Sequence, residues 1–308
     1  MKTRQQASDG FNRHLRECFT ALLPRQRGAA QNTITSCRQT WNMLLGHVAE
    51  HHHVPLEKVT FALIDRATVA GFLEHTRATK SWTPSTYNQR LACRRSFFIY
   101  AAAAEPTLTI YLADLAAIPR LSAPAAAPVK SMNTGAVTAL LAAPDPETRS
   151  GLRDQFFMIL MYDLAARDAE MLAMNLADID TKRLTVDLLG KGSKPRRLPI
   201  TSGTAQHFGR YAAVFHPGSE PTTPMVYTIR NHHPTRMSDD NAVRLIGQHA
   251  ATAKTRCPDV PARVYPHMLR HSRAMHLYQA GMPLALLTEW LGHTDPETTF
   301  IYAHAAPR

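Results

Sequence analysis

The sequence predicts a mainly α-helical protein of two domains with one small β-hairpin or sheet. Apolar residues recur at three- and four-residue steps along most of the 308 residues. A stretch rich in alanine and proline, residues 116–130, interrupts this pattern and is typical of an extended linker. Two strand-like runs flank a glycine turn that begins at residue 190. We therefore expect an N-terminal helical domain at 1–115, a linker at 116–130 and a second domain at 131–308.

The N-terminal domain is predicted to be a small helical bundle. Ile34, Trp41 and Val48 belong to one amphipathic pattern, and Phe72 belongs to a shorter one. A third helix is predicted to begin at Thr83–Pro84, because threonine is a favoured N-cap and proline is favoured at the first helical position. At least three helices are therefore expected to pack together in this domain.

The second domain is predicted to be mixed but mostly helical. Residues 151–176 carry a helical apolar period and are predicted to form one helix. The runs 184–189 and 196–200 enclose the glycine turn and predict a β-hairpin. After Ser238, a favoured N-cap, helix is expected nearly to the end of the chain, with breaks at two glycine-containing turns.

The balance of charges favours a polyanionic partner. Lys and Arg number 35 against 24 Asp and Glu, which gives a formal net charge of +11. Such an excess favours nucleic acid ahead of an anionic membrane surface. The excess is larger before residue 125, where there are 15 basic and 8 acidic side chains. Arg90, Arg94 and Arg95 on the third predicted helix are therefore predicted to face DNA.

Other sites and compartments are disfavoured by the sequence. The four cysteines lie far apart and none forms a C-x-x-C pair, so neither a disulfide framework nor a cysteine zinc site is predicted. His51–His53 and His232–His233 lack partners at ligand spacing and are expected to lie in solvated loops. There is no signal-like segment and no apolar run long enough to span a membrane. We expect a soluble, cytoplasmic, nucleoid-associated protein of prokaryotic type without a metal or a membrane partner.

The residues that can carry chemistry gather near the C-terminus. His267 and Arg270 lie three residues apart on a predicted helix and so share a face, and His293 lies in the turn before the helix that bears Tyr302. A guanidinium presents a fork of donors that fits two phosphate oxygens. A phenol, with an ordinary pKa of about 10, attacks only when its anion is stabilised or its proton is accepted. This set suits nucleophilic attack on a phosphodiester.

The spacing of these residues resembles that of the tyrosine recombinases, the superfamily of the phage integrases and the Xer and Cre proteins. The H-x-L-R-H, L-G-H and T-x-x-Y boxes of that superfamily match residues 267–271, 291–293 and 299–302. His267, Arg270, His293 and Tyr302 follow one another at steps of 3, 23 and 9 residues. The resemblance is strong in the second domain and weak in the first. It implies a helical core-binding bundle followed by a catalytic domain with the fold of DNA breaking-rejoining enzymes.

Two further boxes of the superfamily match upstream. Residues 164–171 resemble the box T-G-L-R-x-S-E-L and place Arg167 and Glu170 at its arginine and glutamate. Leucine and alanine stand here at the usual threonine and glycine. The turn 190–194 resembles the hairpin G-K-G-x-K and points to Lys191 as the catalytic lysine.

The resemblance implies metal-independent transesterification of DNA without a cofactor. Tyr302 would attack the scissile phosphate and remain attached as a 3′-phosphotyrosyl ester, so no nucleotide triphosphate is needed. Arg167 and Arg270 would bind the nonbridging oxygens, supported by His293, because negative charge builds there in the transition state.

Three further residues are expected to assist the reaction. His267 would help to manage the tyrosine proton, and Lys191 would protonate the leaving 5′ oxygen. Lys194 is close enough in the sequence to replace Lys191 or to contact DNA. Glu170 either orients a neighbouring basic group or is an ordinary surface carboxylate.

Recombination implies an assembly, and the resemblance implies a homotetramer on double-stranded DNA with specific recombination sites. Two alternatives remain open: a topoisomerase-like enzyme of type IB that relaxes one duplex, and a catalytically impaired DNA-binding relative. Only six residues follow Tyr302, from which we expect weak cyclic coupling between protomers. The short segment 1–30 favours a two-domain enzyme of a mobile element over an integrase with an additional arm-binding domain.

Overall fold

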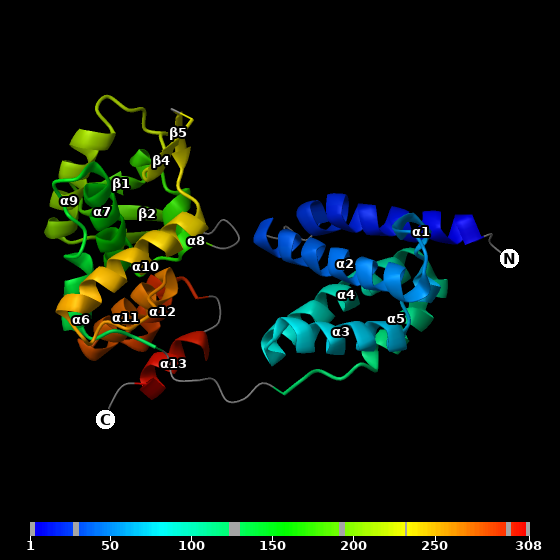
Figure 1. The fold of residues 1–308 in the computed structure, drawn as a ribbon. Helices are drawn as coiled ribbons and strands as arrows, with labels where there is room; N and C mark the ends of the chain where they lie inside the picture. The colour runs from blue at the N-terminus through cyan, green and yellow to red at the C-terminus, as the bar shows by residue number, and fades with distance from the viewer. Residues whose placement is uncertain are drawn as a thin grey trace. The chain divides into compact units, whose positions relative to one another are not determined.

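The computed structural model describes residues 4–26, 31–122, 130–190, 195–231, 233–293 and 297–305. The chain divides into two compact units, Met1–Ala126 and Ala127–Arg308. In Figure 1 the first runs from blue to green and the second from green to red. Lys191 and Lys194 lie outside the described residues. Within the described ranges, no helix is both long enough and apolar enough to cross a membrane.

The first unit is a bundle of helices. It contains α1 (Arg4–Glu17), α2 (Gln31–His52), α3 (Arg66–Lys80), α4 (Pro84–Ala104) and α5 (Thr109–Ala116), with a π-helical segment at Cys18–Gln26 and short 3-10 turns at Leu56–Lys58, Phe61–Leu63 and Pro106–Leu108. The three predicted helices are confirmed as α2, α3 and α4. The hydroxyl of Thr83 accepts a hydrogen bond from the backbone N of Thr86 at 3.2 Å and caps α4 as expected. His51 and His52, expected in a solvated loop, instead form the last turn of α2.

Aromatic rings fill the centre of this bundle. The ring of Trp41 on α2 lies 4.7 Å from that of Phe97 on α4, edge to face. Phe11 of α1 makes a similar contact with Phe61 at 5.1 Å. Burial of one side chain of this size contributes about 1.5 to 3 kcal/mol, so these rings hold the helices together. Ile118 is buried in the same cluster, so the packed part of this unit extends past residue 116, where the linker is expected to begin.

The predicted DNA-facing stripe on α4 is wrong for Arg94. This side chain is fully buried, and its guanidinium carbon lies 4.7 Å from the ring centroid of Phe72. Arg95 donates hydrogen bonds to three backbone carbonyl oxygens at the C-terminal end of α5. Arg90 donates to the backbone carbonyl oxygen of Ser36 on α2 at 2.7 Å. The helical period shows which residues share a face, but it does not show that this face meets the neighbouring helices.

The second unit combines helices with two small antiparallel sheets. Its elements are α6 (Thr134–Leu141), α7 (Arg149–Leu164), α8 (Asp168–Ala173), a 3-10 turn (Leu176–Asp178), β1 (Ile179–Asp180), β2 (Thr185–Leu189), β3 (Pro195–Pro199), α9 (Ser202–Phe215), β4 (Tyr227–Arg230), β5 (His233–Arg236), α10 (Asp239–Arg256), α11 (Pro266–Gln279), α12 (Leu284–Leu291) and α13 (Glu297–Ala305). The predicted hairpin is confirmed as β2 and β3, with Val186 opposite Leu198. A second hairpin, β4 and β5, includes His233, which was expected in a loop.

The single helix predicted over 151–176 is wrong, because two helices form here. α7 ends at Leu164, and Ala165 adopts a left-handed conformation with φ of +48° that no helix can continue. The chain is extended at Arg167, and α8 begins at Asp168. The apolar period runs through this break because both helices bury residues in one core, so the period alone does not reveal it. The break places Arg167 at a helix N-terminus, beside the functional site.

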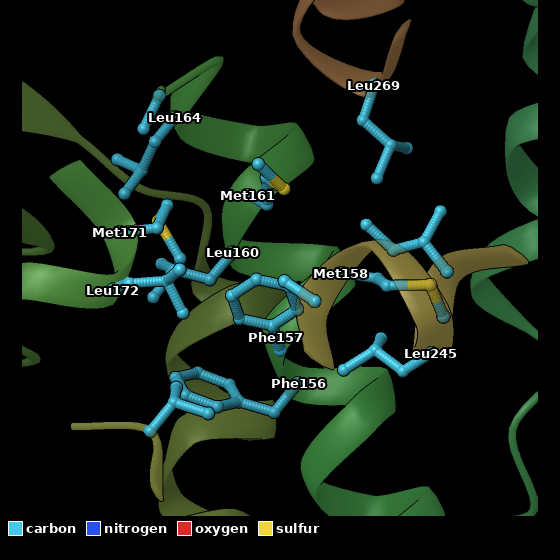
Figure 2. Packing of buried hydrophobic residues seen from close by; sticks show 14 of the residues in the cluster. Phe156, Phe157, Met158, Leu160, Met161, Leu164, Met171, Leu172, Leu245 and Leu269 are labelled. Carbon is cyan, nitrogen blue, oxygen red and sulfur yellow. The ribbon is translucent and has the colours of Figure 1, made fainter. Parts of the chain in front are cut away.

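α7 is the central helix of the second unit. Phe156, Phe157, Leu160 and Leu164 project from it into the core, as Figure 2 shows. Met171 and Leu172 of α8, Leu245 of α10 and Leu269 of α11 surround them in the same view. Because α7 is enclosed on several sides, the loop at its end and the start of α8 are held rigidly.

Candidate active site

Arg270 lies at the centre of the candidate site and is 2% exposed. From α11, its Nη1 donates to the carbonyl oxygen of Ala165 and its Nη2 to that of Leu291, each at 2.7 Å. These acceptors lie at the C-terminal ends of α7 and α12, where helix dipoles favour a cation. Burial lowers the pKa of Arg270 to about 10, so the guanidinium stays charged at neutral pH.

Arg167 reaches the same turn from the start of α8. Its Nη2 donates to the carbonyl oxygen of Gly292 at 3.0 Å, and its Nη1 donates to Glu170 at 2.7 Å. The side chain of Arg167 is 28% exposed, so its guanidinium is still open to a ligand. The two predicted arginines are thus brought together, because adjacent carbonyl groups of Leu291 and Gly292 bind one each.

Glu170 is the buried anion of the site. It pairs with Arg167 and also with Arg196 of β3, whose Nη1 and Nη2 donate to the two carboxylate oxygens at 3.0 and 2.7 Å. Burial alone would raise the pKa of Glu170, but the hydrogen bonds from Arg196 and Arg167 outweigh it and lower the pKa to about 2. Of the two expectations for Glu170, the orienting role fits this geometry and the surface carboxylate does not.

Arg196 is a site residue that the sequence analysis did not identify. Besides Glu170 it binds α12, because its Nε donates to the carbonyl oxygen of Trp290 at 3.1 Å. Gly292 adopts φ of +61°, and a Cβ there would lie 3.0 Å from Nη1 of Arg196. Both the backbone conformation and this close approach favour glycine in the L-G-H turn.

His293 follows this turn and joins Arg270 to α13. Its Nε2 accepts from Nη2 of Arg270 at 3.0 Å, and its Nδ1 lies 2.9 Å from the hydroxyl of Thr299. Burial, together with the charges of Arg270 and Arg167, lowers the pKa of His293 to about 4. At neutral pH the ring is therefore uncharged, with Nε2 as acceptor and Nδ1–H as donor to Thr299.

Tyr302 of α13 is fully buried in this structure. It packs in a small cluster with Ala165, Ala274, Met275, Leu287 and Leu291. Burial raises the pKa of Tyr302 to about 12, although Arg270 opposes the shift. The phenol is therefore neutral, and only a change in its surroundings can ionise it near pH 7.

The hydroxyl of Tyr302 is bonded to His271, a residue to which the sequence analysis assigned no role. The distance to Nδ1 of His271 is 2.7 Å. Burial first, and then the charges of His267 and Arg270, lower the pKa of His271 to about 4, so the ring is neutral at neutral pH and its Nδ1 can accept a hydrogen bond from the phenol. The second histidine of the H-x-L-R-H box was the available signal, because it lies one turn after His267 on α11.

His267 is exposed at the first turn of α11, and its ring lies 5.1 Å from that of His271. Burial of part of the ring, followed by the charge of Arg270, lowers its pKa below 6.5. The proton-handling role expected for His267 stays a prediction. So do the roles of Lys191 and Lys194, which lie outside the described residues. Among the histidines, cysteines and acidic residues that the structure describes, no group of three is placed to hold a metal ion.

Comparisons with known proteins place this site in context. Residues 130–308 match the model of the phage integrase family. The Sinorhizobium fredii protein y4rC, whose name assigns it to the integrases and recombinases, is 30% identical over 293 residues, with 94% of this chain and 86% of that protein covered. Tyrosine recombinase XerD of Neisseria meningitidis is 34% identical over 170 residues, which cover 55% of this chain and 56% of XerD.

Solved structures share the fold. A crystal structure of the XerH site-specific recombinase bound to its difH substrate aligns with a TM-score of 0.67 at 16% identity, covering 98% of this chain and 94% of that one. A lambda integrase dimer bound to a core site aligns with a TM-score of 0.67 at 14% identity, covering 96% and 78% respectively.

Proposed function

The chain belongs to the phage integrase family and is a tyrosine-type site-specific recombinase, and we propose that it opens DNA with the hydroxyl oxygen of Tyr302. One observation carries this assignment of the residues. Arg167 and Arg270 bind the carbonyl groups of consecutive residues, Gly292 and Leu291, beside His293. Arg270 also acts electrostatically on Tyr302. We infer that one phosphate can meet both guanidinium groups.

The proposed reaction exchanges one phosphate ester for another. The oxygen of Tyr302 forms a bond to phosphorus as the bond to the 5′ oxygen breaks, which leaves a 3′-phosphotyrosyl ester and a 5′ hydroxyl. Attack by a 5′ hydroxyl on the phosphotyrosine rejoins a strand, so bond energy is conserved. Arg167 and Arg270 stabilise the charge on the nonbridging oxygens, and loss of one such donor typically slows reactions by about 100 to 1,000 fold. His293 supports them by accepting a hydrogen bond from Arg270.

Cleavage requires Tyr302 to leave its buried position. A phenol with no exposed surface has no room for a phosphate at its hydroxyl, and a pKa of about 12 disfavours the anion. We expect DNA binding to separate Tyr302 from His271 and to bring the phenol oxygen beside Arg270. In that state the negatively charged scissile phosphate accepts hydrogen bonds from the two guanidinium groups.

We propose His267 as the residue that transfers the proton of the tyrosine hydroxyl. His267 is exposed on the face of α11 that carries Arg270, so a bound DNA backbone can reach it. His271 contacts the phenol oxygen in this structure, but its expected separation from Tyr302 on DNA leaves His267 as the candidate for this task. Lys191, which follows β2 in the sequence, is proposed to protonate the leaving 5′ oxygen, with Lys194 as the alternative.

Double-stranded DNA with a specific recombination site is the proposed substrate, and a homotetramer on two such sites is the proposed assembly. The net charge of +11 supports binding that weakens steeply with salt. We propose that the first unit is the core-binding domain and that the chain is encoded by a mobile element. With Arg94 buried, the DNA contacts of the first unit must come from side chains other than that one.

The decisive experiment uses a pool of nicked suicide duplexes with randomised cores, in which the released 5′ fragment is lost and the covalent intermediate accumulates. We expect a protein–DNA adduct that survives SDS, persists in EDTA and is absent in Tyr302→Phe. Tyr278→Phe, another phenol of the second unit, is the matched control and should keep the adduct. An adduct in Tyr302→Phe, or none in the parent protein with any sequence in the pool, contradicts the assignment.

A further inference from the structure

Cys37 and Cys93 meet in the first unit although 56 residues separate them in the sequence. Cys37 lies on α2 and Cys93 on α4, and their sulfur atoms are 2.7 Å apart. Both are free thiols in the structure. We propose that they are a redox-active pair, in which a peroxide oxidises Cys93 and Cys37 then closes a disulfide between the two helices.

The geometry needs little change to form that bond. A disulfide joins sulfur atoms at about 2.05 Å, so the two thiols are already nearly at bonding distance. Both helices are anchored by the aromatic core around Trp41 and Phe97, which keeps the sulfurs together. A closed pair would tie α2 to α4 at one further point.

The two thiols differ in access. Cys37 is 7% exposed, whereas Cys93 is half-buried and open to a small oxidant from solvent. A peroxide therefore reaches Cys93 first, and Cys37 is shielded except from its neighbour. This asymmetry assigns Cys93 as the attacking thiolate and Cys37 as the thiol that resolves it.

The charges around Cys93 favour its anion. Arg94 is fully buried, and none of its three guanidinium nitrogens has a hydrogen-bond partner in the described part of the chain. Arg90 is the second cation that acts on Cys93. The hydrogen bond from Cys37, together with these cations, outweighs burial and lowers the pKa of Cys93 to about 7. The bond to Cys93, followed by burial, raises the pKa of Cys37, which therefore stays protonated. An anion at Cys93 is also the counter-charge that the unpartnered Arg94 otherwise lacks.

The reaction balances with one equivalent of hydrogen peroxide. The Cys93 thiolate attacks one peroxide oxygen, the O–O bond breaks, and the departing hydroxide takes a proton to become water, which leaves Cys93 as a sulfenic acid. The sulfur of Cys37 then attacks the sulfur of Cys93, the S–O bond breaks, and the second hydroxide leaves as water with the proton of Cys37. Two electrons pass from the sulfurs to the peroxide.

The test uses the full chain and does not depend on the recombination chemistry. The protein is treated with one equivalent of hydrogen peroxide, alkylated with N-ethylmaleimide, digested and analysed by mass spectrometry with and without dithiothreitol. We expect an intramolecular Cys37–Cys93 peptide that dithiothreitol releases. Cys257, a half-buried thiol of the second unit, is the internal control. It should oxidise more slowly than Cys93 and should not appear in an intramolecular disulfide.

Substitutions separate the two roles. In Cys37→Ser the sulfenic acid of Cys93 should accumulate and be trapped by dimedone, whereas in Cys93→Ser the thiol of Cys37 should remain reduced. Oxidation of Cys93 no faster than Cys257, unchanged oxidation of Cys37 in Cys93→Ser, or a disulfide that involves Cys18 in place of either partner would overturn the proposal.

The role of the buried cation has its own measurement. In the parent protein the rate of Cys93 alkylation by iodoacetamide should reach half its maximum near pH 7. Arg94→Met, similar in length but uncharged, should move this midpoint up by about one pH unit or more. If that variant does not fold, Arg90→Gln should move the midpoint in the same direction, because Arg90 also lowers the pKa of Cys93. A midpoint in the parent at or above about pH 8.5, the ordinary value of a thiol, contradicts the assignment.

Discussion

Glu170 shows how the catalytic arginines are held in place. Its buried carboxylate accepts four hydrogen bonds, two from Arg167 and two from Arg196. Glu170→Gln removes the charge that both guanidinium groups share while keeping the size of the side chain. We expect this variant to be less stable and to cleave DNA more slowly, because Arg167 loses the partner that orients it.

The size of the effect follows from the pKa of Glu170, which is about 2 against an ordinary value of 4.5. At 1.36 kcal/mol for each pH unit, this difference corresponds to about 3 kcal/mol in favour of the charged form. The pKa is lower in the folded state, so this stabilisation is present above pH 4.5 and is lost as the pH falls toward 2. Removing one partner of a buried ion pair typically costs about 3 to 5 kcal/mol, which agrees. We therefore expect Glu170→Gln to lower the free energy of unfolding by about 3 kcal/mol at neutral pH.

Urea unfolding and cleavage of the suicide duplex measure the two effects. The matched control is Asp187→Asn. Asp187 of β2 pairs with Arg197 of β3, the neighbour of Arg196, at 2.8 Å, but the side chain of Asp187 is 49% exposed. An exposed pair contributes about 0 to 1 kcal/mol, so this control should change stability little. Cleavage should fall on the order of 100 fold in Glu170→Gln and stay near the parent rate in Asp187→Asn. Two outcomes would contradict the orienting role of Glu170: equal losses of stability in the two variants, or cleavage by Glu170→Gln at the rate of the parent protein.

Three further predictions follow from backbone conformation and from buried histidines. Gly292→Ala should destabilise the second unit by about 1 to 2 kcal/mol, because alanine disfavours the left-handed conformation and its Cβ meets Arg196; unchanged urea unfolding would contradict this. Ser81→Gly should stabilise the first unit by about 0.5 to 1 kcal/mol, because exposed Ser81 ends α3 with φ of +51°, a conformation that glycine adopts without strain. A lower midpoint of urea unfolding in this variant would contradict the prediction. The pKa of His271 is about 4 in the folded state and 6.5 ordinarily, so the unfolded chain takes up the proton first and stability should fall as the pH drops through this range. His271→Gln should reduce that slope of unfolding free energy against pH by up to about 1.4 kcal/mol per pH unit, and an identical slope in both proteins would exclude the effect.

Local rules predicted many of the elements. The caps at Thr83 and Ser238 are confirmed, because a capping side chain acts on backbone groups within its own first turn. The prediction of helix nearly to the end of the chain after Ser238 is wrong at 257–265, where the chain leaves helix between α10 and α11. The β2–β3 hairpin is also confirmed, because its signal in the sequence is local: two strand-like runs close to each other around glycine. The predicted helix over 151–176 is wrong because Ala165 breaks it, and alanine carries no local signal for a left-handed conformation. Helices α1, α5, α6 and α9 and the second hairpin were not predicted from the sequence.

The order of residues along the chain shows which chemical groups are available: two arginines, two histidines and a tyrosine, in motifs whose members lie within a few residues of each other. Spacing within one helix turn needs only the period of the helix, so Arg270 and His267 could be placed on one face from the sequence alone.

The contacts between distant parts of the chain depend on how the whole unit packs. Arg167 bonds to Gly292 across 125 residues, Arg196 to Glu170 across 26, and Cys37 lies against Cys93 across 56. Packing also buries Arg94 in the core and brings His271 within hydrogen-bond distance of the hydroxyl of Tyr302. Helical periodicity shows which residues share a face of a helix, but packing of the whole unit determines what that face contacts. The burial, the pKa and the ion pairs of each side chain depend on those contacts.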